Sequence, residues 1–335
     1  MSPPAEAQEA GVSITPVWMR MPSRARASVV LFAVCLLAYT LLLVFAPRYK
    51  GATTTKGDEP HYLIIAESII RDGDVFLANN YKEKQYEKYF EGDIMMLHIA
   101  HGRNGRWVST HPMATSLLVL PGFLLLGYPG AAFTMALLTC FSAAFTFALA
   151  DRFVHRLLAF WVTLFLFLSY PLVFYSRLIY PETPVLFLVA LGTWASWRLR
   201  ESGRSLHAAL AGLSAGMMAL FHPKFAAISV CMFFLFLMVR PSRDAGLLTW
   251  WLAPAAAPLA LLLVLTCITY GPNLARGLTA SGGSKFGGGY WGTNSVRGIP
   301  GMYLDRAWGL FIFAPAYMLF PVGLSLQKDA LEWER

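Results

Sequence analysis

Long unbroken blocks of apolar residues recur along this chain, and short polar turns separate them. The longest blocks match the roughly 18–20 residues that a helix needs to cross a bilayer. They also lack the alternation expected of half-buried strands. The pattern therefore predicts an all-α polytopic membrane protein with about eight transmembrane helices. The predicted spans are residues 28–46, 130–150, 157–175, 183–199, 206–221, 224–239, 247–270 and 307–325.

Three stretches outside these blocks have their own character. A polar stretch, residues 47–112, follows the first span as a long first outer loop. The next segment, 113–127, is apolar but short and contains Pro121 and Gly122, so we expect an interfacial or re-entrant segment rather than a span. A glycine-rich loop, 271–301, precedes the last span.

The arginine clusters give the layout a direction across the membrane. With the N-terminus inside, four of the five inner segments hold clustered arginine, as the positive-inside rule requires. A crossing at 113–127 would move the later clusters outside. We therefore expect the first outer loop and the glycine-rich loop on the outer face. The segments assigned to the cytoplasm are 1–27, 151–156, 198–205, 240–244 and 326–335.

The amino-acid composition supports this interpretation and limits the classes of binding partner. Hydrophobic residues make up 56% of the chain and charged residues 14%, whereas soluble domains are about 25% charged. The net charge of +8 would suggest nucleic acid in a soluble protein. Here much of the excess lies in short loops, where it sets topology. We expect membrane lipids as partners and no nucleic acid.

An amphipathic helix is predicted near the start of the first outer loop. Pro60 suits its first turn, Asp58 or Glu59 suits the N-cap and the positive end of the helix dipole, and Gly73 suits its end. Apolar residues recur at helical spacing on one face, so we expect the helix to lie on the membrane surface. The opposite face carries His61, Glu67, Ser68 and Arg71.

The acidic pair Asp58-Glu59 has two interpretations. Both carboxylates can be ordinary helix caps. Alternatively, one is a general base at the membrane–water boundary, where a hydroxyl nucleophile needs a proton acceptor. Position along the chain does not decide between them.

The string that contains this pair, GDEPHYLIIAESIIRDGDVFLANNY, resembles the first outer loop of GT-C glycosyltransferases. More specifically, it is similar to bacterial membrane proteins that resemble dolichyl-phosphate-mannose–protein mannosyltransferases. The resemblance extends over residues 28–325, which it implies form a GT-C-like transmembrane module. Further motifs follow in matching order: HP at 111–112, SRLIYPE at 176–182, HPK at 222–224 and DRAWGL at 305–310.

The resemblance implies a glycosyltransferase in the bacterial cytoplasmic (inner) membrane. It would move a sugar from a polyprenyl-phosphate-linked donor to an acceptor at the outer face. Asp58 would be the general base, with Glu59 supporting it or positioning the acceptor. Similar proteins usually continue past the eighth span, so a second interpretation stays open: a non-catalytic subunit or scaffold that works with other membrane protein subunits.

Binding a lipid phosphate at the outer face requires cations there. Arg177 and Lys224 lie at span ends and are candidates for this role, and Glu182 is placed to pair with either. The alternative for both cations is snorkelling to headgroups. Tyr290 and Trp291 in the glycine-rich loop could stack on a sugar, or the loop is a plain linker. The other candidate substrate-binding residues are His61, Tyr62, His111 and His222.

The histidines of the first outer loop raise the question of a metal. His98 and His101 are three residues apart and could share a helix face, and His111 follows. No third ligand has the spacing of a zinc motif. We therefore predict no metal site and no cofactor. The alternative is a divalent cation at Asp58 and Glu59.

Overall fold

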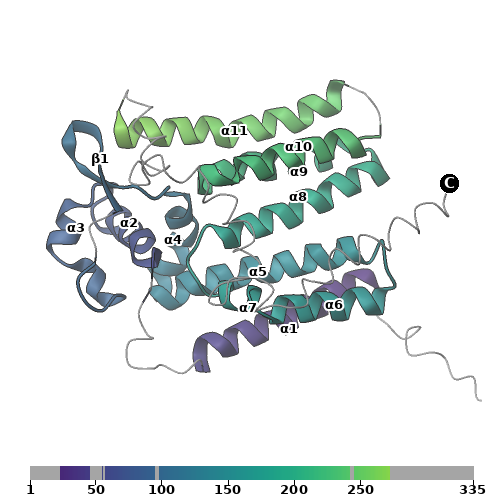
Figure 1. Ribbon diagram of the computed structural model, residues 1–335, viewed down its shortest axis with the longest axis horizontal. Coiled ribbons are helices and arrows are strands. Elements are labelled where there is room, and N and C mark those ends of the chain that lie inside the picture. Colours follow the sequence, from purple (N-terminus) through teal and green to yellow (C-terminus); the bar gives the residue numbers. More distant parts are fainter. Residues whose placement is uncertain (1–22, 46–54, 56, 95–97, 242–244, 272–335) are drawn as a thin grey trace, which may run out of the picture.

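The computed structural model describes residues 23–45, 55, 57–94, 98–241 and 245–271. Within these residues the protein is all-α, with eleven α-helices, a few short 3₁₀ turns and one small antiparallel pair of strands. Most of the long helices lie side by side in a bundle (Figure 1). The bundle helices are α1 (Arg24–Phe45), α5 (Tyr128–Ala150), α6 (Arg156–Leu168), α8 (Glu182–Ser202), α9 (Ser205–Phe221), α10 (Ala226–Val239) and α11 (Ala245–Tyr270).

Among the described residues, three helices are long and apolar enough to cross a membrane. They are α1, α5 and α11, with 22, 23 and 26 residues. Large apolar side chains cover their outward faces and those of their neighbours, as in Phe45 (73% exposed) and Met238 (83% exposed). Such exposure is expected where helices face lipid rather than water. The chain therefore has the character of a multi-pass membrane protein.

Other predicted spans correspond to shorter or interrupted helices. The predicted spans 183–199, 206–221 and 224–239 coincide with α8, α9 and α10. The predicted single span 157–175 is wrong in one respect, because α6 ends at Leu168 and a separate helix, α7 (Leu172–Tyr175), follows. Pro171 lies in the break and has no N–H to continue the helix. The predicted span 307–325 and most of the glycine-rich loop lie outside the described residues.

The segment predicted not to cross forms α4 (Ala114–Leu126), a helix of 13 residues. At 1.5 Å per residue it extends about 20 Å, short of the roughly 30 Å of a bilayer core. The chain turns back at Gly127, which has a φ of +64°. A Cβ at Gly130 would lie 2.0 Å from the carbonyl oxygen of Gly122, so only glycine lets α4 and α5 approach this closely.

The turns assigned to the cytoplasm meet at one end of the bundle. Arg24 at the start of α1 pairs with Asp151, directly after α5. Arg152 pairs with Glu201 in the last turn of α8. These contacts agree with the prediction that the turns share a face, and which side of the membrane they face stays a prediction.

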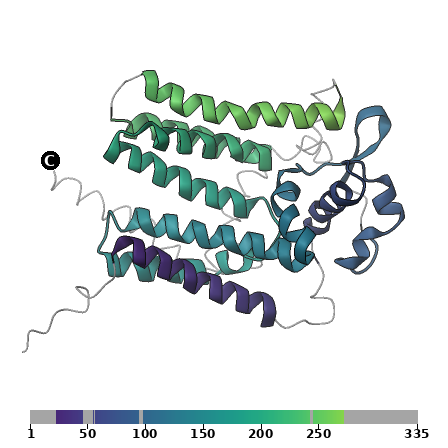
Figure 2. The ribbon, with the colours of Figure 1, turned by 180° about the vertical axis from the view of Figure 1, so that it is seen from behind.

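The first outer loop and α4 cap the other end of the bundle (Figures 1 and 2). The elements of this loop are α2 (Glu59–Arg71), α3 (Ala78–Lys82), a 3₁₀ turn η2 (Gln85–Lys88), β1 (Ile99–His101), a 3₁₀ turn η4 (Arg103–Gly105) and β2 (Trp107–Ser109). They pack around a core of their own, which also includes residues of α4 and α5. The loop is therefore a folded cap rather than a connecting segment.

The predicted surface position of α2 is wrong, because α2 is buried on both faces. Every residue from Glu59 to Ser68 is buried. Its polar side chains have partners inside the cap: Glu67 pairs with Arg71 and Lys88, and Ser68 donates to Asp74. Buried polar groups with such partners are tolerated, so a helix that is amphipathic in sequence can lie in an interior.

The cap is fastened to the last described helix. The hydroxyl of Tyr270 in α11 donates to the carbonyl oxygen of Ser109 in β2, at 3.2 Å. A Cβ at Gly102 would lie 2.6 Å from the carbonyl oxygen of Thr269, so the β1–β2 turn touches α11 backbone to backbone. This contact fixes the strands, and the residues that flank them, against the bundle end.

Candidate functional site

Asp58 lies where the cap meets the bundle. It occupies the N-cap position of α2, yet its side chain makes no capping hydrogen bond. Its backbone N–H donates to the hydroxyl of Tyr180, at 3.3 Å. The carboxylate is 42% exposed and is turned towards two histidines. The simple capping interpretation therefore does not describe Asp58.

Three histidines and Asp58 form one group, called here the histidine–aspartate cluster: Asp58, His61, His98 and His111. The Nε2 atoms of His98 and His111 lie 3.9 Å and 4.0 Å from Asp58 Oδ1. The rings of His98 and His111 are stacked, with centroids 4.7 Å apart. The His61 ring lies 4.4 Å from that of His98, and its Nδ1 is 3.0 Å from the hydroxyl of Tyr81.

The strand pairing brings His98 and His111 together although they are distant in sequence. Ile99 pairs with Ser109 across the antiparallel strands. The N–H of Thr110 then donates to the carbonyl oxygen of His98, at 2.9 Å, and the N–H of His111 donates to Ser109 Oγ, at 3.0 Å. The register therefore places the residue before β1 beside the residues after β2.

Burial keeps two of these imidazoles neutral. Burial, with a smaller contribution from the neighbouring His98, lowers the pKa of His61 to about 3 and that of His111 to about 3. His61 therefore contacts Tyr81 as a neutral ring. His111 Nε2 is buried and has no hydrogen-bond partner among the described residues.

An ion pair joins the turn after α9 to the start of α8. Lys224, in the 3₁₀ turn η5 (Pro223–Phe225), pairs with Glu182 at the start of α8, so of the two partners that the sequence allowed for Glu182 the structure selects Lys224. Burial and the Lys224 cation lower the pKa of His222, whereas Glu182 and Asp58 raise it. Burial is the largest of these effects and Asp58 the smallest.

Glu59 and Arg177 are predicted site residues that do not belong to the histidine–aspartate cluster. Glu59 is 1% exposed, and its Oε1 accepts a hydrogen bond from the N–H of Ile179, at 2.9 Å. It therefore joins α2 to the segment before α8. Arg177 is half-buried, and in the described part of the chain it forms no ion pair with Asp58 or Glu182.

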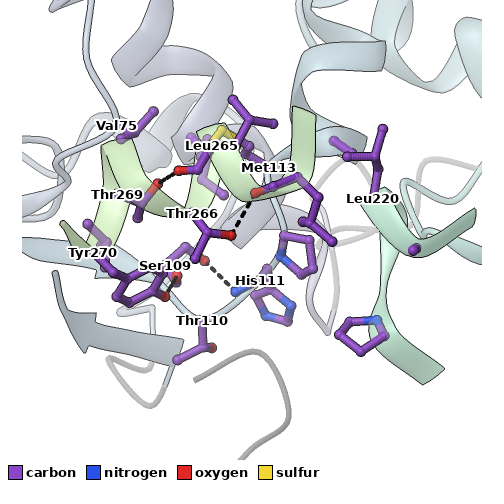
Figure 3. Close-up of a pocket in the computed structure, with 17 residues that line it drawn as sticks. Val75, Ser109, Thr110, His111, Met113, Leu220, Leu265, Thr266, Thr269 and Tyr270 are labelled. Carbon is purple, nitrogen blue, oxygen red and sulfur yellow. Dashed lines mark hydrogen bonds between the residues drawn. The ribbon is translucent and has the colours of Figure 1, made fainter. Parts of the chain in front are cut away.

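His111 also lines a pocket (Figure 3). Its walls come from the strip 108–114, from the ends of α9 and α11, and from Ile65 and Val75 of the cap. Apart from His111, Tyr270 and a few hydroxyls, the lining is apolar. Tyr62, which is buried, lies against His111 with ring centroids 4.9 Å apart. The cluster therefore has an apolar pocket beside it.

The structure thus groups most, but not all, of the predicted residues. Asp58, His61, Tyr62 and His111 are in contact, and His222, Glu182 and Lys224 are adjacent. Tyr290 and Trp291 lie outside the described residues. The sequence suggests His98 only as a metal ligand that shares a helix face with His101, and it does not predict the place of His98 beside Asp58. Residues 99–101 form β1 instead, and His101 is exposed.

Comparison with protein-family models, with curated proteins and with solved structures finds no match for this chain. The function is therefore inferred from the geometry of the site and from the sequence motifs that the geometry brings together.

Proposed function

We propose that this protein is a GT-C-like glycosyltransferase with eight spans in a bacterial cytoplasmic membrane. Its N-terminus is cytoplasmic, and its cap and cluster lie at the outer face. It moves a sugar from a polyprenyl-phosphate donor to an acceptor hydroxyl. The observation that carries the proposal is the Asp58 carboxylate, which is accessible, not used as a helix cap, and located beside an apolar pocket at a bundle end.

In the proposed reaction Asp58 is the general base. It takes the proton of the acceptor hydroxyl as the oxygen attacks the anomeric carbon of the donor sugar. The bond between that carbon and the phosphate oxygen breaks, and the polyprenyl phosphate leaves with the electron pair. The open side of the Asp58 carboxylate gives the acceptor access from water, which a buried base would not.

Lys224 and Arg177 are the cations proposed to bind the leaving phosphate. Lys224 is exposed and lies in the turn between the end of α9 and the start of α10. Its partner Glu182 holds the ammonium in place until a phosphate competes for it. Arg177, without an ion pair to Asp58 or Glu182 in the described residues, is the second proposed phosphate ligand because guanidinium binds phosphate through paired hydrogen bonds.

The apolar pocket suits the lipid part of the donor. Leu262, Leu265 and Leu220 line it from α11 and α9, two helices whose other faces are exposed and apolar. A prenyl chain lying there would put its phosphate near His111 and Lys224. The histidines would then separate the lipid from the carboxylate that receives the proton.

The test is sugar transfer from a polyprenyl-phosphate donor in membranes that contain the full chain. Replacing Asp58→Asn should lower turnover by about 10²–10⁴-fold, the usual contribution of general-base catalysis. Asp93→Asn is the matched control, since Asp93 is an exposed carboxylate of the same loop, paired with Lys84. Unchanged turnover in Asp58→Asn contradicts the assigned base. Failure of the wild-type protein to bind any such donor favours the non-catalytic scaffold.

A further inference from the structure

We propose that Asp58, His98 and His111 bind one divalent transition-metal ion of the zinc class. Each residue offers one ligand atom, and the three atoms all lie within 4.8 Å of one another. They come from the N-terminus of α2 and from both ends of the strand pair. Sequence spacing did not predict such a site, because the register of the strands creates it.

The distances fit a zinc-sized ion after a small closure. Zinc–ligand bonds of about 2.0–2.1 Å in a tetrahedral site put the ligand atoms roughly 3.3 Å apart. The observed separations from Asp58 Oδ1 are 3.9 Å to His98 and 4.0 Å to His111. All three separations are within 4.8 Å, so rotation of the half-exposed Asp58 and His98 side chains has to close gaps of up to about 1.5 Å.

His111 supplies a second, independent observation. Its side chain is 11% exposed, and its Nε2 atom is buried without a hydrogen-bond partner among the described residues. Buried polar nitrogen atoms in native proteins nearly always have a partner. This Nε2 atom lies 4.0 Å from Asp58 Oδ1, and an ion bound between the two would give it a partner.

The types of ligand limit which metal ions the site would bind. Two imidazoles and one carboxylate suit zinc, cobalt, nickel or ferrous iron, whereas magnesium and calcium prefer oxygen ligands. Three protein ligands also leave a coordination position open, as in catalytic rather than structural zinc sites. The main chain of His98 and His111 is fixed by the hydrogen bonds to Thr110 and Ser109, so two of the three ligands are held in advance.

The open position suits an oxygen ligand, such as a phosphate oxygen or a hydroxyl. Asp58 would use Oδ1 for the metal and keep its second oxygen for the incoming hydroxyl. This assignment of the open position rests on the proposed function. The metal site itself rests only on the three ligands.

The experiment measures metal binding by the full-length protein in mild detergent after treatment with a chelator. Cobalt is titrated and followed by its visible absorption, zinc is then added in competition, and metal content is determined by mass spectrometry. We expect one ion per chain. His98→Ala, His111→Ala and Asp58→Asn should each weaken binding by at least about 10–100-fold, the loss that even outer-shell changes cause.

His101→Ala is the matched control, because His101 is an exposed histidine three residues from His98 and outside the cluster. It should bind cobalt as the wild type does. If His111→Ala does not fold, the loss of metal binding in Asp58→Asn tests the site instead. A half-exposed carboxylate can be changed without disturbing the core. Absence of binding in the wild type, or equal binding in every variant, would overturn the metal site.

The two proposals can fail separately. A protein that binds cobalt at these residues but transfers no sugar keeps the metal site and loses the glycosyltransferase function. A protein that transfers sugar after chelation, and binds no metal, loses the metal site alone.

Discussion

Glu59 offers a direct test of how the acidic pair is divided between structure and chemistry. Its carboxylate is 1% exposed and accepts a hydrogen bond from the N–H of Ile179, at 2.9 Å. Glu59→Ala would leave that buried N–H without this acceptor, which costs about 1–3 kcal/mol. Glu59→Gln keeps an oxygen at the same place and should cost less. Asp58→Asn, at a half-exposed position without a capping bond, should change stability by less than about 0.5 kcal/mol.

The assay is the free energy of unfolding, measured by denaturant titration in mild detergent, together with sugar transfer. Glu91→Ala is the surface control, because Glu91 is an exposed glutamate of the same cap. We expect Glu59→Ala to be less stable than Glu91→Ala, and Glu59→Gln to retain transfer while Asp58→Asn does not. The reasoning is refuted if Glu59→Gln keeps full stability and loses transfer, since Glu59 would then be the chemical group.

Two further predictions concern the bundle. A Cβ at Gly216 would lie 2.2 Å from the carbonyl oxygen of Ala255, so Gly216→Leu should separate α9 from α11 and lower the free energy of unfolding by at least about 1–3 kcal/mol. Leu213→Phe, on the exposed face of α9, should leave it unchanged. Denaturant unfolding of both variants in detergent makes the comparison. The hydrogen bond from Arg152 holds the pKa of Glu201 at about 2, against an ordinary 4.5. The unfolded chain therefore binds the proton more tightly, so the stabilisation is complete above about pH 4.5 and is lost as pH falls towards 2. Glu201→Gln should flatten this part of a stability–pH curve, and an unchanged curve would contradict the assigned ion pair.

The sequence predicted the elements that are marked by long runs of apolar residues. Blocks of apolar residues located α1, α5 and α11, and the short apolar segment 113–127 located α4, although α4 continues through Pro121 and Gly122. The interior of the cap could not be predicted in the same way. The polar face of α2 indicated a water-facing helix, because sequence periodicity does not show that Lys88 and Asp74 return to cover Glu67 and Ser68.

The histidine–aspartate cluster shows a second limit. His98 and His111 are neighbours only through a pair of three-residue strands, which are too short to give an alternating pattern. Asp58 and Glu59 are adjacent and chemically alike, yet one is turned to the cluster and the other to Ile179. Which carboxylate faces which way depends on the tertiary position of α2, and local sequence does not contain that information.

The hydrogen bond between Tyr270 and Ser109 joins residues 161 positions apart. During synthesis from the N-terminus, the cap is made long before α11 leaves the ribosome. The β1–β2 turn can reach its final place only after α11 has been made and inserted. A truncated chain that ends before residue 270 would therefore carry Asp58, His98 and His111 without the contact that seats them. Completion of the site is in this way coupled to the insertion of a late membrane helix.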